Sequence, residues 1–169
     1  MIFLTFSLLL ILVTSDAEPQ NVALRGRATH STNVGSPSAA INAIDGNTDP
    51  LWARGTCFSS QSELSPWWRV DLLKTHKISH ITITNRGDCC ADYINGVEIL
   101  IGDSLANNGN NNPRCAKITA IPLAGTQTFQ CNDMAGRYVN LIRTGISGHL
   151  TFCEVQVFGV PLNNCYYHT

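Results

Sequence analysis

Short apolar runs recur along the chain, and in several of them apolar and polar residues alternate. Between residues 96 and 102, for example, Val97, Ile99 and Ile101 fall on one face of an extended segment. Segments rich in Asn and Gly separate these runs. The pattern predicts β-strands over residues 67–73, 78–84, 96–102, 117–123, 126–131, 136–143 and 150–160.

Residues 37–44 are the segment whose sequence favours a helix, with Ser36 as a candidate N-cap and Pro37 at the first helical position. No internal repeat or linker divides the chain. Regularly spaced strands with turn signals between them predict one all-β domain, folded as an antiparallel β-sandwich or jelly roll.

The first residues follow a different pattern. Residues 2–13 are mainly apolar and too few to span a bilayer, and Ser15 and Ala17 stand at the −3 and −1 positions of a signal-peptidase site. We therefore expect a secreted, extracellular protein without membrane insertion. Its predicted parts are a signal peptide over residues 1–17, a domain over 18–160 and a polar tail over 161–169.

Charge and motifs disfavour two classes of function. The chain has 11 Lys and Arg residues against 12 Asp and Glu residues, without a basic cluster, so a nucleic-acid or polybasic membrane binder is not expected. It also lacks the G-x-S-x-G, H-E-x-x-H and P-loop motifs, which disfavours an enzyme.

Cysteine use agrees with secretion. The chain has seven cysteines without the spacing of a zinc site, so in an oxidising compartment we expect disulfides. The count is odd, and Cys165 in the polar tail is the candidate for a cysteine left over or paired between chains.

A candidate cation site lies between residues 42 and 56. Asp45, Asn47 and Asp49 occupy alternate positions, as at the start of an EF-hand loop, but the Gly and Glu that such a loop needs later are missing. The alternative is a turn held by Asx hydrogen bonds.

A disulfide between Cys57 and Cys153 would supply the missing carboxylate, because Glu154 follows Cys153 directly. Cys115 and Cys131, which flank two predicted strands, would then form a local bridge. Six paired cysteines allow fifteen arrangements, so these considerations leave the connectivity open.

Five ordered motifs, NAIDGN, PWWRVDL, TITNRGDCC, GRYV and CEVQV, resemble the F-type lectins, which are fucose-binding agglutinins of fish and invertebrates. The similarity extends from Asn21 to Val160. It implies a jelly roll related to discoidin-type and other galactose-binding-like domains, a structural Ca²⁺ and a shallow sugar site among the loops at one end. It also implies glycan partners and a role in innate immunity. Weak single sites gain avidity from multivalency, so a homo-oligomer is one candidate assembly, and the sequence leaves the oligomeric state open.

The resemblance implies specific disulfides and Ca²⁺ ligands. The disulfides would be Cys57–Cys153, Cys115–Cys131 and Cys89–Cys90. The Ca²⁺ ligands would be Asn42, Asp45, Asn47, Thr56, Cys153 and Glu154, with Asn42, Asn47 and Cys153 contributing main-chain carbonyls.

The lectins of this family hold the sugar with a His, an Arg and a second basic residue. Arg86 matches the Arg, and Asp88 is placed to hold its guanidinium by a charge-assisted bond. Ser59 stands at the position of the His, and Tyr93 stands at that of the second basic residue. We therefore expect a carbohydrate site altered from that of an ordinary fucose lectin.

Adjacent cysteines are a poor match to ordinary disulfide geometry. Their Cα atoms lie about 3.8 Å apart across a trans peptide, whereas disulfides usually need about 4.4 Å or more. A Cys89–Cys90 bond would be strained, and such strain tends to mark binding sites. Its sulfurs could lie against the apolar face of a sugar, with Trp52 and Phe58 as further walls. The alternatives are that each cysteine pairs elsewhere or that both are reduced.

Two other functions remain possible at this point. The sequence Arg86-Gly87-Asp88 is that of an integrin ligand, which would need both side chains free in a loop tip. A discoidin-like binder of lipid or protein would need exposed apolar side chains at loop tips, and Leu51, Trp52 and Phe58 are the candidates.

Overall fold

A computed structural model describes residues 17–162. The predicted signal peptide, apart from Ala17, lies outside the described residues, and so does Cys165 with most of the predicted tail. No helix among residues 17–162 has the length and apolar character needed to cross a membrane.

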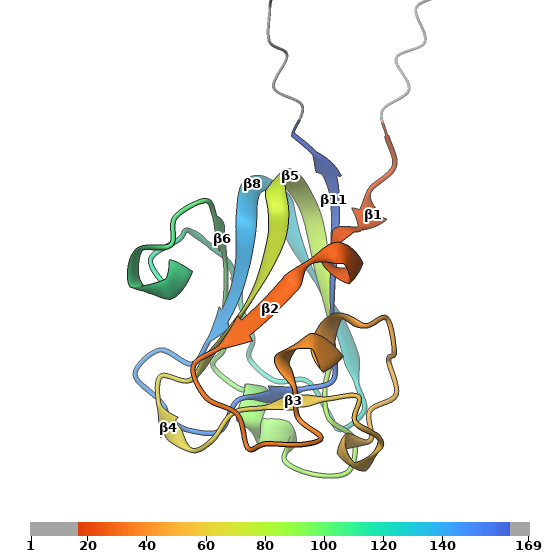
Figure 1. The fold of residues 1–169 in the computed structure, drawn as a ribbon, viewed down its shortest axis with the longest axis vertical. Helices are drawn as coiled ribbons and strands as arrows, with labels where there is room; N and C mark the ends of the chain where they lie inside the picture. The colour runs from red at the N-terminus through yellow and green to blue at the C-terminus, as the bar shows by residue number, and fades with distance from the viewer. Residues whose placement is uncertain (1–16, 163–169) are drawn as a thin grey trace, which may run out of the picture.

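Two long strands form the centre of a seven-stranded antiparallel sheet (Figure 1). They are β5 (Trp67–Thr84) and β8 (Thr126–Ile142), which pair along almost their whole length. The first part of β5 also pairs with β2 and its second part with β11. The other strands of this sheet are β1 (Gln20–Asn21), β2 (Arg27–His30), β6 (Glu98–Gly102), β7 (Arg114–Lys117) and β11 (Glu154–Pro161).

Four shorter strands form two small antiparallel pairs. β3 (Phe58–Ser59) pairs with β10 (Thr151–Phe152), and β4 (Glu63–Leu64) pairs with β9 (Ser147–Gly148). Both ends of the described chain lie at one end of the molecule, and β3 and β4 lie at the other (Figure 1). The prediction of an all-β antiparallel fold is confirmed.

The core lies between the main sheet and the segments that cross it. Trp68 and Phe152 are fully buried, and their rings meet edge to face with centroids 5.3 Å apart. The indole N–H of Trp68 donates to the carbonyl of Ala40 at 3.0 Å. Burial of each such large apolar side chain stabilises the fold by about 1.5–3 kcal/mol. These contacts fix the segment around Ala40 and the strand β10 to the main sheet.

The strand boundaries differ from the predicted ones in four places. Predicted strands 67–73 and 78–84 are one strand, as are 126–131 and 136–143, because pairing between β5 and β8 resumes beyond register shifts that the sequence does not reveal. The strand predicted over 117–123 is wrong. β7 ends at Lys117, and the buried side chains of Ile118 and Ile121 lie in a loop. The strand predicted over 150–160 is divided into β10 and β11.

The predicted helix is also wrong. Its segment forms only a 3-10 turn, η2 (Ala40–Ile44), preceded by a cis peptide bond between Ser36 and Pro37. The N-cap is Ala39, whose side chain makes no capping bond. Tertiary contacts decide the local conformation here, because the carbonyl of Ala40 accepts the indole N–H of Trp68 at 3.0 Å. The side chain of Asn42 adds a local bond to the carbonyl of Pro37 at 2.6 Å.

Candidate functional site

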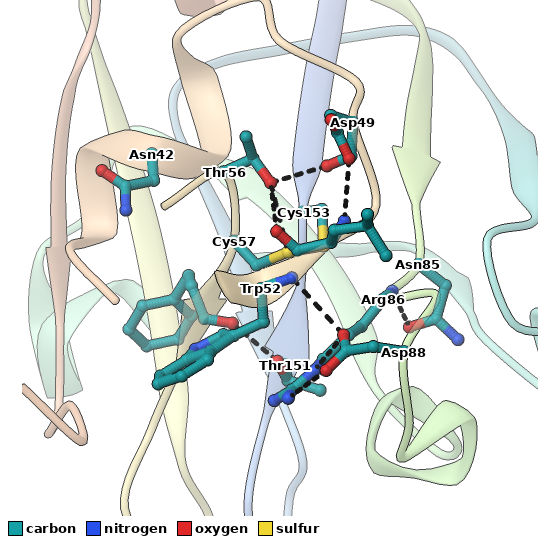
Figure 2. Close-up of a disulfide and its surroundings, with 12 residues drawn as sticks. Asn42, Asp49, Trp52, Thr56, Cys57, Asn85, Arg86, Asp88, Thr151 and Cys153 are labelled. Carbon is teal, nitrogen blue, oxygen red and sulfur yellow. Dashed lines mark hydrogen bonds and ion pairs between the residues drawn. A yellow bond between two sulfur atoms is a disulfide. The ribbon is translucent and has the colours of Figure 1, made fainter. Parts of the chain in front are cut away.

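Among residues 17–162 three disulfides are formed, and they are the three implied by the family resemblance: Cys57–Cys153, Cys89–Cys90 and Cys115–Cys131. The first joins residues 96 positions apart and ties the strand β3 to the start of β11 (Figure 2). It therefore brings Glu154 to the loop that precedes β3.

A ladder of Asx hydrogen bonds holds that loop. Asp45 Oδ1 accepts the amide of Asn47 at 2.8 Å, Asn47 Oδ1 that of Asp49 at 3.0 Å, and Asp49 Oδ1 that of Leu51 at 3.1 Å. Asp49 also pairs with Arg54 at 2.5 Å. The Asx-turn interpretation of this segment is therefore correct, and it leaves main-chain carbonyls and further carboxylate oxygens available to a cation.

Glu154 is fully buried beside this loop. Its Oε1 accepts the amide of Gly46 at 3.1 Å, while its Oε2 is buried without a hydrogen-bond partner among the described residues. Burial, and then the carboxylate of Asp45, raise the pKa of Glu154 to about 8. A bare buried oxygen beside a second carboxylate fits a cation, since a bound ion would replace the missing hydrogen bond and offset the repulsion.

The other residues implied as Ca²⁺ ligands are arranged in different ways. Thr56 Oγ1 lies 2.7 Å from the carbonyl oxygen of Asp49, so its hydroxyl already serves the loop (Figure 2). The side chain of Asn42 is turned away from Thr56, and the amide of Cys153 donates to the carbonyl of Thr84 at 2.9 Å. The structure thus leaves the carbonyls of Asn42 and Cys153 as their possible ligand atoms.

Side chains alone would not make this a metal site. Within residues 17–162, no three His, Cys, Asp or Glu side chains gather closely enough to hold a metal ion. A cation at this loop would depend on main-chain oxygens together with the carboxylates of Asp45 and Glu154, which is a combination that Ca²⁺ accepts.

The second group of candidate residues is built around Arg86, just beyond the end of β5. Its Nε donates to Asp88 Oδ1 at 2.8 Å and its Nη2 to Asp88 Oδ2 at 2.7 Å (Figure 2). The guanidinium carbon lies 5.2 Å from the ring centroid of Trp52, within the range of a cation–π interaction. Hydrogen bonds from Arg86 lower the pKa of Asp88 to about 2.

This pair excludes the integrin interpretation of the Arg-Gly-Asp sequence, because Arg86 and Asp88 bind each other and the Arg86 side chain is only 14% exposed. Neither the Nη1 atom of Arg86 nor the second N–H of its Nη2 donates to any described residue. Those N–H groups are available to a ligand.

Close packing explains the glycine between the pair. A Cβ at Gly87 would lie 3.0 Å from side-chain atoms of both Pro50 and Ala124. The amide of Gly87 donates to the carbonyl of Pro50 at 2.8 Å, and the side chain of Asn85 donates to the carbonyl of Ile121 at 2.7 Å. The candidate cation loop, residues 42–56, and the turn of residues 85–88 that carries Arg86 are therefore in direct contact.

Ser59 and Tyr93, the residues expected at the positions of the family's other two sugar-binding residues, lie on separate elements and differ in exposure. Ser59 is only 5% exposed and lies on β3 opposite Thr151 of β10. Tyr93 lies on the 3-10 turn η4 (Ala91–Ile94), which follows Cys90 directly, and its side chain is half-buried.

Two aspects of the site differ from expectation. Phe58 is fully buried, 5.6 Å from Phe152 between ring centroids, so it belongs to the core and forms no wall of a sugar site. His149, which the sequence did not single out, stacks on the ring of Tyr93 with centroids 5.2 Å apart and planes 19° apart. Only the tertiary structure reveals this partner, because His149 follows β9 in an irregular segment without a motif.

Comparison with known proteins identifies close similarities. A family model described as a NedA-like, galactose-binding domain matches residues 42–141. Fucolectin-4 of Anguilla japonica is 49% identical over 150 residues, covering 85% of this chain and 83% of that protein. Fucolectin of Anguilla anguilla is 49% identical over 144 residues, covering 82% of this chain and 90% of that protein.

A solved structure is similar as well. The crystal structure of an F-lectin (fucolectin) from the serum of striped bass, Morone saxatilis, matches with a TM-score of 0.83 and 48% identity, over 86% of this chain. This chain spans half the length of the striped bass protein. The predicted jelly-roll fold of the galactose-binding type is confirmed by these similarities.

Proposed function

The chain belongs to the fucolectin family of F-type lectins, and from this membership we propose that it is a secreted, Ca²⁺-dependent lectin that binds glycans through Arg86. Glycan recognition in innate immunity is the role proposed for it. A binding module, rather than an enzyme, agrees with relatives that are lectins.

The observation that carries this proposal is the geometry of Arg86. Two of its N–H groups are committed to Asp88, which fixes the plane of the guanidinium, while the remaining ones face outward from the pair. A planar fork of this kind can bridge two adjacent sugar hydroxyls, which a Lys ammonium does less well. The ring of Trp52 and the Cys89–Cys90 disulfide offer apolar surface for the C–H face of a sugar.

Ca²⁺ is proposed as a structural ion in the loop before β3. The carboxylates of Asp45 and Glu154 and the main-chain carbonyls of Asn42, Asn47 and Cys153 would hold it, with Thr56 at the edge. Support comes from the bare, buried Oε2 of Glu154. Bound there, the ion would rigidify the loop that carries Trp52 and contacts Gly87.

The affinity that we expect for fucose depends on Ser59 and Tyr93, which replace two basic side chains. Hydrogen bonds from charged donors are each worth about 1.5–3 kcal/mol, so the loss of two basic side chains weakens a fucose site unless other groups compensate. We therefore propose a fucosylated or related glycan as the ligand, with modest affinity for each site. Such a lectin gains avidity by assembling into a homo-oligomer.

A discoidin-like binder of lipid or protein is less well supported. Phe58 is fully buried, and Trp52 is half-buried against Arg86, so neither stands out from a loop tip as such a binder would require. The guanidinium of Arg86, with its free N–H groups, instead favours a ligand rich in hydroxyl groups.

A glycan array on the full secreted chain tests the proposal. The native protein should bind fucosylated or related glycans in Ca²⁺, and Arg86→Ala should weaken that binding at least about tenfold. Arg114→Ala is the matched control, because Arg114 is an exposed arginine paired with Glu98 on the strands β6 and β7. A native chain that binds no glycan, or an Arg86→Ala variant that binds like the native chain, would overturn the proposal.

A further inference from the structure

Ser59 and Tyr93 lie on separate segments, and one further side chain contacts the surroundings of both. The ring of His149 stacks on that of Tyr93, and its Nδ1 lies 2.8 Å from the carbonyl oxygen of Ser60, the residue after Ser59. A single imidazole thus contacts Tyr93 and the residue next to Ser59.

Four hydrogen bonds hold His149 and its neighbour in place. The ring bonds to Ser60, and the carbonyl of His149 accepts Arg143 Nη1 at 2.6 Å. The amide of Leu150 donates to Ser60 Oγ at 2.8 Å, and the amide of Ser60 donates to the carbonyl of Leu150 at 2.9 Å. His149 is therefore a pre-organised side chain on a rigid support.

The bond to Ser60 also decides what the ring offers. A carbonyl oxygen can only accept, so Nδ1 of His149 carries the hydrogen and Nε2 is left with its lone pair in the neutral imidazole. Among the described residues, neither Nε2 of His149 nor the hydroxyl of Tyr93 has a hydrogen-bond partner, and neither is a buried orphan. Both polar atoms are open to solvent.

Tyr93 is fixed relative to Arg86. Its amide donates to the carbonyl of Cys90 at 3.0 Å, next to the vicinal disulfide. The side chain of Asn85 donates to the carbonyl of Ala91 at 3.1 Å and accepts the amide of Arg86 at 2.8 Å. Arg86, the disulfide and the stacked pair accordingly belong to one cluster of hydrogen-bonded loops.

From this geometry we propose that the Tyr93–His149 pair is a specificity-determining part of the sugar site and takes the place of the two missing basic residues. The inference rests on the proposed lectin function. An Arg or Lys at the position of Tyr93 would only donate hydrogen bonds, whereas Nε2 of His149 accepts and the Tyr93 hydroxyl does both. The pair therefore selects neutral glycans that present a donating hydroxyl beside the sugar held by Arg86, and not sialylated or sulfated ones.

The test compares His149→Phe and Tyr93→Phe with the native full chain, by array on neutral and sialylated oligosaccharides and by calorimetry with the glycan that binds best. Each variant keeps a ring in the stack. Tyr93→Phe loses the hydroxyl, and His149→Phe loses Nε2 together with the Nδ1 bond to the carbonyl of Ser60, whose effect on the fold the melting temperature reports. We expect affinity to fall about two- to tenfold, as for a lost neutral hydrogen bond, and the rank order of glycans to change. The matched control is His80→Phe, because His80 also stacks on an aromatic ring, that of Phe158, with centroids 4.5 Å apart.

The outcomes separate this inference from the lectin proposal. If Arg86→Ala loses binding while His149→Phe and Tyr93→Phe keep the native affinity and rank order, the inference is wrong and the lectin proposal stands. An equal loss on every glycan together with a lower melting temperature would show a merely structural role and would also overturn the inference. A native chain that binds no glycan would overturn both.

Discussion

Arg86 and Asp88 form a two-point ion pair across a single intervening glycine, with both carboxylate oxygens of Asp88 bonded to the guanidinium. Most of the Arg86 side chain is covered, so this pair sets the direction in which the free N–H groups point. Asp88 is accordingly a positioning residue, and its effect on ligand binding can be separated from its effect on the fold.

Asp88→Asn should weaken glycan binding about tenfold, because the amide holds the guanidinium less firmly and without charge. The melting temperature should change little, since partly exposed ion pairs contribute little to stability. Calorimetry with the best-binding glycan measures the first effect and thermal unfolding the second. Asp92→Asn, an exposed acidic residue in the neighbouring turn, is the control. Native affinity in Asp88→Asn would contradict the assigned role.

The same pair predicts a pH dependence. The folded pKa of Asp88 is depressed from 3.8 to about 2, so the pairing with Arg86 stabilises the folded protein fully above pH 4 and is lost as the pH falls through about 2. An NMR titration of the Asp88 carboxyl carbon should therefore give a midpoint well below 3.8. A midpoint at or above 3.8 would mean that the pair does not form in solution.

Removal of Ca²⁺ should lower the melting temperature of the native chain. A ligand that binds only the folded state stabilises it by about 2.7 kcal/mol at a hundred times its dissociation constant. Glu154→Gln is the informative variant, because it removes the carboxyl group whose second oxygen is buried without a partner among the described residues. Its melting temperature should be the same in Ca²⁺ and in EDTA. Identical melting curves of the native chain in Ca²⁺ and EDTA would exclude an occupied site.

Tyr93→Arg should increase affinity for L-fucose, because it restores a charged donor three residues beyond the vicinal disulfide. Ser59→His should help less, since Ser59 is 5% exposed and a larger side chain there must displace its neighbours. Calorimetric titration of both single variants and the double variant measures these effects. A double variant that binds fucose no better than the native chain would show that the altered positions do not limit affinity.

The sequence predicted the fold class because strict alternation, as in residues 96–102, reports burial on one face of a sheet. It could not predict that β5 and β8 are each continuous, since pairing resumes after register shifts that depend on the partner strand. The prediction of a strand over residues 117–123 was wrong for a related reason. Ile118 and Ile121 are apolar because a loop is buried there, not because the segment is a strand.

The candidate site was predictable where it depends on local sequence. Asp88 is two residues from Arg86, and Cys89 and Cys90 are adjacent in the sequence, so both contacts are local. His149 was missed because its contacts with Tyr93 and Ser60 arise only when distant segments meet. Phe58 was misplaced because periodicity cannot tell a core aromatic from one that lines a rim, and its packing on Phe152 decides the matter.

The described chain begins and finishes at the pole opposite β3 and β4 (Figure 1). Arg86 follows Thr84, which pairs with Glu154 at the end of β11 opposite Pro161. A bead, a sensor chip or a fused protein attached through Leu162 would therefore leave Arg86 unobstructed. Copies anchored on one surface by this end would all present the opposite end, with β3 and β4, away from that surface. Several copies could then contact the glycans of one cell surface at the same time.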